Sequence, residues 1–333
     1  MRSLGEITIT FNPADAGFDL EFLMRDRVFH RVAVLMGGPS DERKVSLKSG
    51  MAVAEGLREA GYDVCEVDVT GHEVVLPKGI DAVFIALHGE FGEDGQVQSI
   101  LDDMGIPYTG SGAVGSKMAM DKVLTKRAFD EFGIPSPLYE VLSKGDKPTL
   151  ELPVVVKPAC QGSSIGVHCV TSENEREAAL KDAFCYGETL LVEKFVKGRE
   201  LTVGVVGRRV LPVVEIVTAD GWYGYEAKYF KGNTKYIVPA DIDHQVTADA
   251  QRIALRVFDA LKCEGFGRVD FILSDDGELL VLELNSIPGF TETSLLPKAA
   301  ASAGIAFSEL CDIIMRNAEK RKAEKRKTES LKG

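Results

Sequence analysis

Residues 267–285 read GRVDFILSDDGELLVLELN, and this stretch carries the clearest structural signal in the 333-residue chain. Two apolar runs, Gly267–Leu273 and Leu279–Leu284, predict neighbouring strands. The turn residues Asp275-Asp276-Gly277 lie between them and predict a hairpin connection. Because strand side chains alternate between the two faces of a sheet, the polar residues within these runs fall on predictable faces.

Four polar side chains of this hairpin indicate an anion site and a metal site on one face. Glu283 and Asn285 are two positions apart and therefore share a face, and Arg268 faces the same way as Asp270. Three side chains with hard oxygen atoms suit Mg²⁺, which completes its coordination with water and nucleotide phosphates. Arg268 would hold a phosphate or a developing oxyanion. A salt-bridged Arg–Asp pair in a purely structural hairpin is the alternative.

A second signal lies upstream, where the strand Val154–Pro158 ends at a loop rich in glycine and serine. Lys157 near the strand end offers a cation, and the loop Cys160–Gly166 offers free backbone N–H groups, a combination that cradles phosphate oxygens. The motif is not the nucleotide-binding loop GxxxxGK[ST], because the lysine precedes the glycines. Taken alone, a GSSxG loop of this kind favours an ordinary surface turn over a phosphate site.

The N-terminal third predicts an open parallel α/β layer. An apolar run at Val32–Met36 is typical of a buried parallel strand. A helix over Val45–Ala60, with Gly61 as its C-terminal cap, and two further strands, Val64–Val67 and Ala82–Leu87, are expected to follow.

Ligands of such sheets bind beyond the carboxyl ends of the strands, where Gly37-Gly38 and His88-Gly89 fall. Glu42 lies near the start of the predicted helix and would accept a substrate ammonium. Its charge would alternatively only complement the helix dipole. His88 at its strand end would contact a carboxylate, or would be a hydrogen-bonded turn residue.

The middle and C-terminal parts predict mixed helices and strands. Lys117–Phe132 is expected to be one helix that links the first domain to the second. Leu190–Val196 and Leu201–Val206 are predicted to be strands of one layer. A loop rich in glycine and tyrosine, Gly221–Gly232, and a helix, Ala248–Leu261, follow. The charged tail beyond Arg316 predicts the frayed end of a helix.

Composition excludes several classes of function. The net charge of −12 argues against a nucleic-acid partner, which would require a basic face. The six cysteines are scattered without a CxxC pair, which favours free thiols in a reducing cytoplasm over zinc or disulfides. No apolar run is long enough to span a membrane, and the N-terminus lacks the features of a signal peptide.

Taken together, the motifs resemble those of the D-alanine–D-alanine ligases of the ATP-grasp superfamily. The resemblance extends from Arg31 to about Met315. Its most specific segments occur in the family's order: LMGGPSDERKVSLKS (35–49), HGEFGEDG (88–95), YTGSG (108–112), MDK (120–122), KPACQGSSIG (157–166), YEAKY (225–229), GRVD (267–270) and ELNSIPGFT (283–291). Cys160-Gln161 departs from the pairing expected in the phosphate loop, and residues 1–30 have no counterpart.

The resemblance implies an α/β, three-domain ATP-grasp fold with an open parallel N-terminal domain. The expected parts are an N-terminal extension (1–30), a substrate-binding domain (31–115), a central domain (116–197), a C-terminal domain (198–318) and a charged tail (319–333). ATP would bind between the central and C-terminal domains. A cytoplasmic homodimer without nucleic-acid or membrane partners is expected.

The resemblance also assigns roles to individual residues. ATP would be bound by Lys122, Lys157, Ser164, Glu193, Lys194, Phe195, Val196, Glu200 and Lys228. Two Mg²⁺ ions, replaceable by Mn²⁺, would be bound by Asp270, Glu283 and Asn285. Catalytic roles would belong to Glu42, Ser163, Tyr229, Arg268, Gly289 and Ser294, with Arg268 and the Gly289 N–H as the oxyanion hole. Ser163 and Tyr229 would link to Glu42 in a hydrogen-bonded chain that closes the site. The two D-alanines would contact Glu42, His88, Ser294 and Leu295.

The implied reaction joins two D-alanines through an acyl phosphate, giving D-alanyl-D-alanine, ADP and phosphate for peptidoglycan precursors. The loop Gly221–Gly232 would be the lid that excludes water. Tyr229 on this loop favours an amine over D-lactate as the second substrate. Three alternatives differ in class: another ATP-grasp carboxylate–amine ligase, a nucleotide-binding regulatory protein without activity, and a dinucleotide-binding oxidoreductase. The last is disfavoured because Gly37-Gly38-Pro39-Ser40 lacks GxGxxG.

Overall fold

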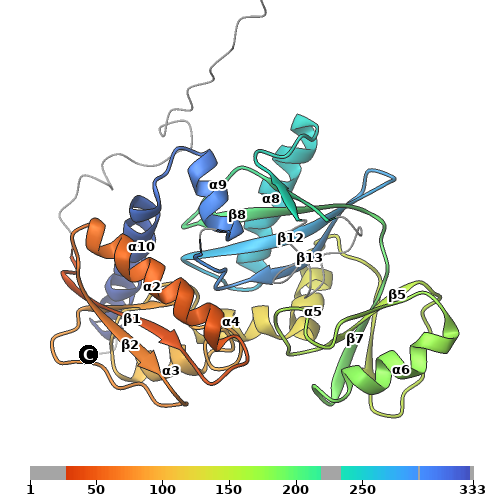
Figure 1. The fold of residues 1–333 in the computed structure, drawn as a ribbon, viewed down its shortest axis with the longest axis horizontal. Helices are drawn as coiled ribbons and strands as arrows, with labels where there is room; N and C mark the ends of the chain where they lie inside the picture. The colour runs from red at the N-terminus through yellow and green to blue at the C-terminus, as the bar shows by residue number, and fades with distance from the viewer. Residues whose placement is uncertain (1–27, 219–233, 292, 331–333) are drawn as a thin grey trace, which may run out of the picture.

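The first sheet of the computed structural model is parallel, as the sequence predicts. The structure describes residues 28–218, 234–291 and 293–330, with side chains to residue 319. The sheet has the order β2-β1-β3, with β1 at Arg31–Gly37, β2 at Asp63–Val69 and β3 at Ala82–Ile85. Six of the seven residues of β1 are buried. The helices α2 (Arg43–Glu59) and α3 (Gln96–Asp103) belong to this part of the chain (Figure 1).

The second sheet is a four-stranded antiparallel one at the opposite end of the molecule from β1 and β2 (Figure 1). Its order is β4-β7-β5-β6, and its strands span Tyr139–Ser143, Thr189–Lys194, Val154–Pro158 and His168–Val170. Helix α6 (Glu173–Ala183) packs on it through the buried Ala179 and Ala183.

The third sheet lies between the other two (Figure 1) and contains the strand pair that the sequence emphasises. Its path is β11-β10-β8-β12-β13, with β9 paired to β8. These strands span Lys235–Ile237, Val214–Val217, Gly198–Val206, Phe266–Ser274, Leu279–Asn285 and, for β9, Arg209–Val210. Helix α8 (His244–Ala260) packs against it, and α9 (Leu295–Ser302) follows it.

The prediction that Leu190–Val196 and Leu201–Val206 share one layer is wrong. The first segment forms β7 in the four-stranded sheet, and the second lies in β8 of the six-stranded sheet. The chain crosses between the sheets just before Gly198, whose backbone passes so close to Leu273 that a Cβ there would lie 2.1 Å from the Leu273 carbonyl oxygen. Both strands are apolar, so the local pattern cannot separate them.

The single helix predicted over Lys117–Phe132 is two helices, α4 (Ala113–Met120) and α5 (Lys122–Phe132). Asp121 separates them with an extended backbone (ψ 104°), and its carboxylate accepts hydrogen bonds from the N–H groups of Val123 and Leu124. Aspartate is a strong N-cap residue because it satisfies such N–H groups. The break makes Lys122 the first residue of α5.

The last helix, α10 (Phe307–Ser330), returns to the first domain and packs on α2. A Cβ on Gly56 of α2 would lie 3.1 Å from Phe307 and from the Cys311 sulfur. Cys311 is completely buried in the same core as β1. Beyond Arg316, where fraying was expected, the backbone remains helical to Ser330. No helix in the described ranges combines the length and apolar character that a membrane crossing requires.

Candidate active site

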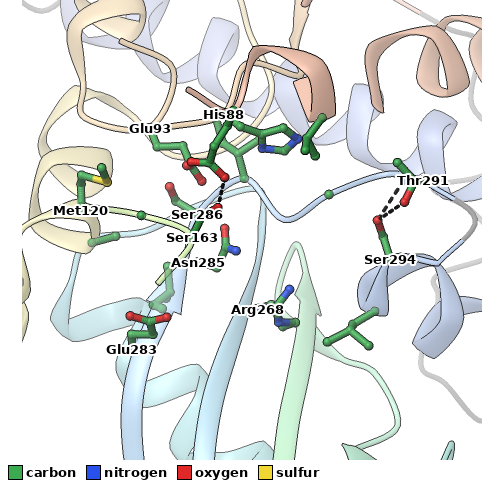
Figure 2. Close-up of a pocket in the computed structure, with 18 of the residues that line it drawn as sticks. His88, Glu93, Met120, Ser163, Arg268, Glu283, Asn285, Ser286, Thr291 and Ser294 are labelled. Carbon is green, nitrogen blue, oxygen red and sulfur yellow. Dashed lines mark hydrogen bonds between the residues drawn. The ribbon is translucent and has the colours of Figure 1, made fainter. Parts of the chain in front are cut away.

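A cavity of about 390 Å³ opens where the three sheets approach one another. Its walls come from the start of α2, the junction of α4 and α5, the loop after β5, and the ends of β12 and β13 (Figure 2). Ten residues singled out from the sequence line it: Glu42, His88, Lys122, Ser163, Arg268, Glu283, Asn285, Gly289, Ser294 and Leu295.

The strands β12 and β13 present their polar residues on one face, as predicted. Arg268 pairs in register with Asn285, and Asp270 with Glu283, before an irregularity that follows Asp270. Figure 2 shows Arg268, Glu283 and Asn285 around the same cavity. Local alternation of side chains therefore suffices to build this wall.

Arg268 and Asp270 form the bidentate ion pair considered as the structural alternative. Arg268 Nε and Nη2 each donate to one Asp270 oxygen at 2.9 Å. Thr202 Oγ1 on β8 donates to Asp270 Oδ1 at 2.6 Å. Asp270 is 6% exposed and is not one of the residues that line the cavity, whereas its partner Arg268 is.

The donor set at this wall fits a hard cation in one specific respect. The Asn285 Oδ1 atom is buried and has no hydrogen-bond partner among the described residues, and Glu283 lies two positions away on the same face. A buried oxygen without a partner is costly unless a ligand satisfies it. In the described ranges no group of three or more His, Cys, Asp or Glu residues forms a metal cage. Such a sparse set suits Mg²⁺, which draws other ligands from phosphates and water.

The lysines expected to bind phosphates lie in a connected cluster. Lys122 Nζ donates to the Gln161 carbonyl at 2.5 Å, and Lys157 pairs with one oxygen of Glu193. The other Glu193 oxygen lies 2.6 Å from Lys126 Nζ, a residue that the sequence does not single out. Burial opposes ionisation of Glu193, but Lys157 and Lys126 outweigh it and lower its pKa to about 2.

The pKa values of Lys122 and Lys157 shift in opposite directions. Burial lowers the pKa of Lys122, and the nearby Lys157 charge acts in the same direction. Burial also opposes the charge of Lys157, but Glu193 and Glu283 raise its pKa above the ordinary value. Lys157 is thus a firmly charged group at the edge of the site.

A second cavity of about 310 Å³ adjoins Lys157 and Glu193. The remaining residues expected to bind adenine and ribose line it, namely Lys194, Phe195, Val196 and Glu200. Lys194 Nζ itself donates to the carbonyls of Glu151 and Leu152, at 2.9 and 3.2 Å. The two cavities therefore divide the predicted nucleotide and substrate residues between them, except for Ser164, which lines neither, and Lys228, which lies outside the described residues.

The predicted link between Glu42 and Ser163 is present (Figure 2). The Ser163 hydroxyl donates to Glu42 Oε1 across 121 residues of sequence. Ser163 and Ser164 both have positive φ, at 50° and 59°, a conformation that non-glycine residues adopt rarely. Such strain is held only where surrounding contacts define it, and it clusters at functional sites. Ser164 does not line either cavity.

Ser49 connects His88 to the loop after β13, although sequence reasoning gave it no role. The Ser49 hydroxyl is completely buried, lies 3.2 Å from His88 Nε2, and accepts the Phe290 N–H at 3.2 Å. Burial lowers the pKa of His88 against the opposing effect of Glu42. Ser49 lies on the buried face of α2, where no local feature of the sequence distinguishes a hydrogen-bonding serine from a packing residue.

The loop after β13 is shaped by Ser294. The Ser294 hydroxyl accepts the Thr291 N–H at 2.9 Å and lies 2.9 Å from Thr291 Oγ1 (Figure 2). A Cβ on Gly289 would lie 2.8 Å from Ser294 Oγ, so glycine allows the backbone to approach this hydroxyl. Gly289 borders the same cavity as Glu42. Tyr229 and Lys228 lie outside the described residues.

Glu93 is a further acidic residue of the cavity wall that the sequence did not single out. Its Oε2 atom accepts the Gly89 N–H at 2.7 Å. Burial and the nearby Glu42 carboxylate raise its pKa to about 8. The position of two carboxylates at one wall follows from the turn after β3, which brings residues 89–93 against the start of α2.

Replacing Glu93 with glutamine should flatten the pH dependence of stability. The folded-state pKa of about 8 lies above the ordinary value of 4.5, so the folded protein holds a proton that the unfolded chain releases. Wild-type stability should therefore fall as pH rises from about 4.5 to about 8, by at most about 1.4 kcal/mol per pH unit. Denaturant unfolding across this pH range measures the slope.

The exposed Glu90 of the same turn provides the control. Glu90→Gln should retain the wild-type slope. An unchanged slope in Glu93→Gln would show that Glu93 releases its proton at the same pH in both states.

Comparisons with known proteins point to one family. The family model for the D-ala D-ala ligase C-terminus matches residues 129–316, and that for the D-ala D-ala ligase N-terminus matches residues 71–111. The D-alanine–D-alanine ligase of Desulforudis audaxviator is 47% identical over 304 residues, which cover 87% of this chain and 99% of that protein. That of Syntrophotalea carbinolica is 46% identical, with 88% and 97% covered.

A solved structure agrees with these sequences. The Bacillus anthracis D-alanine–D-alanine ligase complexed with ATP superimposes with a TM-score of 0.79 at 32% identity. The match covers 89% of this chain and 99% of that one.

Proposed function

Because the chain belongs to the D-alanine–D-alanine ligase family, we propose that the cavity joins two D-alanines at the expense of ATP. The products are D-alanyl-D-alanine, ADP and phosphate. The fold is that of an ATP-grasp enzyme, with a parallel N-terminal sheet and two antiparallel sheets. The chain is therefore a ligase that serves peptidoglycan precursor synthesis.

One observation carries the assignment of the site: Glu42, Ser163 and the β12–β13 pair meet in one cavity. The first is suited to an ammonium, the second belongs to a phosphate-binding loop, and the third offers a cation and oxygen ligands. A reaction between an amino acid and a nucleoside triphosphate requires an ammonium site, a phosphate site and a metal site in one cavity.

The first half of the reaction is the activation of a carboxylate. Glu42 would hold the ammonium of the first D-alanine, with His88 near its carboxylate. Lys122 and Lys157 would neutralise the phosphates of ATP, so that the carboxylate attacks the γ-phosphate and an acyl phosphate forms with ADP as leaving group. Mg²⁺ bound by Glu283 and Asn285, with Asp270, would offset phosphate charge, and Mn²⁺ would suit the same oxygen ligands.

The second half forms the peptide bond. The free amine of the second D-alanine would lie near Ser294 and Leu295 and attack the acyl carbon. The bond between this carbon and the phosphate oxygen then breaks, and the proton that the amine loses leaves with the phosphate. Arg268 and the Gly289 N–H would stabilise the oxyanion of the tetrahedral intermediate. Arg268 already lies at the cavity with its charge balanced by Asp270, so it needs little reorganisation when the oxyanion forms. The lid role of Gly221–Gly232 concerns residues that the structure does not describe.

Glu42→Gln should weaken binding of the first D-alanine and leave ATP binding unchanged. A hydrogen bond to a charged group is worth about 1.5–3 kcal/mol, so KM for the first D-alanine should rise about 10- to 100-fold. Steady-state kinetics with varied D-alanine, together with titration of ATP, separates the two effects. Asp41→Asn, an exposed neighbour, is the control. A matched loss of ATP affinity would argue against an ammonium-binding role.

The activity itself is tested by ATP turnover with Mg²⁺ and D-alanine, L-alanine, D-lactate plus D-alanine, or no substrate. D-Alanyl-D-alanine identified by mass, formed only with D-alanine, is the expected result. Turnover with only another acid–amine pair would show that the site uses a different substrate. The absence of turnover with every pair would contradict the proposed ligase activity. A homodimer in the cytoplasm remains the expected state of the protein.

A further inference from the structure

Lys126 is a buried lysine that has no role in the proposed mechanism. It lies on α5 and its side chain is 1% exposed. Its ammonium is 2.6 Å from Glu193 and 5.7 Å from the centre of the Phe129 ring. Burying a lysine costs free energy unless an opposite charge compensates it, so its place in the core requires an explanation.

Glu193 lies between two lysines, with one oxygen for each. Oε1 faces Lys126 and Oε2 faces Lys157. The side chains of Lys126 and Glu193 are 1% and 2% exposed, whereas that of Lys157 is 14% exposed. Lys157 and Glu193 both line the second cavity, whereas Lys126 does not, and Lys157 is the most exposed of the three side chains.

With both lysines protonated, the cluster of these three side chains carries one surplus positive charge. Burial lowers the pKa of Lys126, and the Glu193 carboxylate beside it opposes that effect. Both lysines stabilise the ionised form of Glu193, whose pKa falls to about 2. With Lys157 alone, the carboxylate and the ammonium would form a neutral pair. With Lys126 present, the Glu193 charge is shared, and the surplus positive charge falls on the more accessible end of the cluster, at Lys157.

The cluster also connects parts of the fold that come from different sheets. Lys157 and Glu193 lie on the adjacent strands β5 and β7 of the four-stranded sheet. Lys126 comes from α5, whose Ala128 and Phe129 are buried in the core of the six-stranded sheet. Lys122 and Lys126 are four positions apart and thus lie on one face of α5, and the Lys122 N–H donates to the Ala159 carbonyl at 2.9 Å.

We propose that Lys126 is a positioning residue for ATP: it holds and shares the charge of Glu193 so that Lys157 presents a net positive charge to the phosphates. This role rests on the proposed function, because it requires ATP at the Lys157 side of the site. Lys126 itself does not touch the nucleotide. Its effect is on phosphate affinity, which distinguishes it from a residue that only stabilises the core.

The test compares ATP and adenosine binding to the full chain by calorimetric titration. Lys126→Met, which removes the charge and keeps an apolar stem, should weaken ATP binding about tenfold, whereas adenosine binding should change less than about twofold. Arg127→Met removes one charge from the next, exposed position of α5 and should change neither affinity. Lys126→Gln provides the same comparison if the methionine variant does not fold.

A double-mutant cycle with Glu193→Gln isolates the charge on Glu193. Once Glu193 is neutral, Lys126→Met should change ATP affinity less than about threefold, because there is no carboxylate charge left to share. Lys126→Arg, which keeps the charge, should bind ATP nearly as the wild type does.

The outcomes separate this role from the proposed function. Equal losses of ATP and adenosine affinity in Lys126→Met, or an undiminished effect in the Glu193→Gln background, would overturn the positioning role. So would wild-type ATP affinity in Lys126→Met and Lys126→Gln. A wild-type chain that binds adenosine and ATP but forms no dipeptide would count against the ligase activity and leave the role of Lys126 standing. A wild-type chain that binds no ATP would overturn both.

Discussion

Arg268→Met should lower the rate of D-alanyl-D-alanine formation about 10²- to 10³-fold, with a small effect on the affinity for ATP. Removal of one oxyanion donor typically has this effect, because the donor acts where charge develops in the transition state. The guanidinium lies at the cavity, and its bidentate pair with Asp270 fixes its orientation. Dipeptide formation measured at saturating ATP and D-alanine gives the change in kcat directly.

The structure supplies a folding check and a control variant for the Arg268 experiment. Asp270 loses two hydrogen bonds in Arg268→Met but keeps that from Thr202, so thermal unfolding must show that the variant is folded. Arg208→Met removes an arginine from an exposed pair with Asp259 and should retain nearly full activity. A loss below about tenfold in Arg268→Met would exclude Arg268 from the oxyanion hole.

Glu283→Gln should also have a large effect. We expect kcat to fall at least about 100-fold and the Mg²⁺ concentration needed for half-maximal activity to rise. Mutation of residues that only orient metal ligands changes metal affinity or activity about 10- to 100-fold, and mutation of a direct ligand should have a larger effect. Glu283 lines the cavity beside Asn285, whose Oδ1 atom lacks a hydrogen-bond partner among the described residues. Activity measured over a range of Mg²⁺ concentrations gives both the midpoint and the maximum rate.

The same hairpin supplies the matched control for Glu283. Glu278 lies in the exposed turn between β12 and β13. Glu278→Gln removes the same charge and should leave the Mg²⁺ midpoint unchanged. If Glu283→Gln lowered kcat without any shift of this midpoint, Glu283 would act on the substrates and not on the metal.

The wall formed by β12 and β13 follows from sequence alone. Alternation within each strand fixed which face Glu283 and Asn285 share, and the in-register pairing with Arg268 and Asp270 agrees with it. The parallel layer of β1, β2 and β3 was predictable from a different local pattern, because its strands are short apolar runs separated by a helix and by turn residues. The ordered motifs also predicted the family.

Contacts between distant segments were predictable only where the family resemblance supplied them. The Glu42–Ser163 hydrogen bond is such a case, since 121 residues separate its partners. No property of residues 42 or 163 alone specifies that distance. The assignment of β7 and β8 to different sheets was missed, because both are apolar strands and only their long-range partners distinguish them.

The sequence by itself thus determined the element types, the direction of neighbouring side chains and the family, since these depend on residues close in the chain or on their order. The tertiary structure alone decided that Lys126 and Ser49 are buried beside Glu193 and His88. It also decided that Thr202 on β8 donates a hydrogen bond to Asp270, the partner of Arg268. The physical reason is that burial and ion pairing depend on which elements pack together, a long-range property that local spacing does not encode.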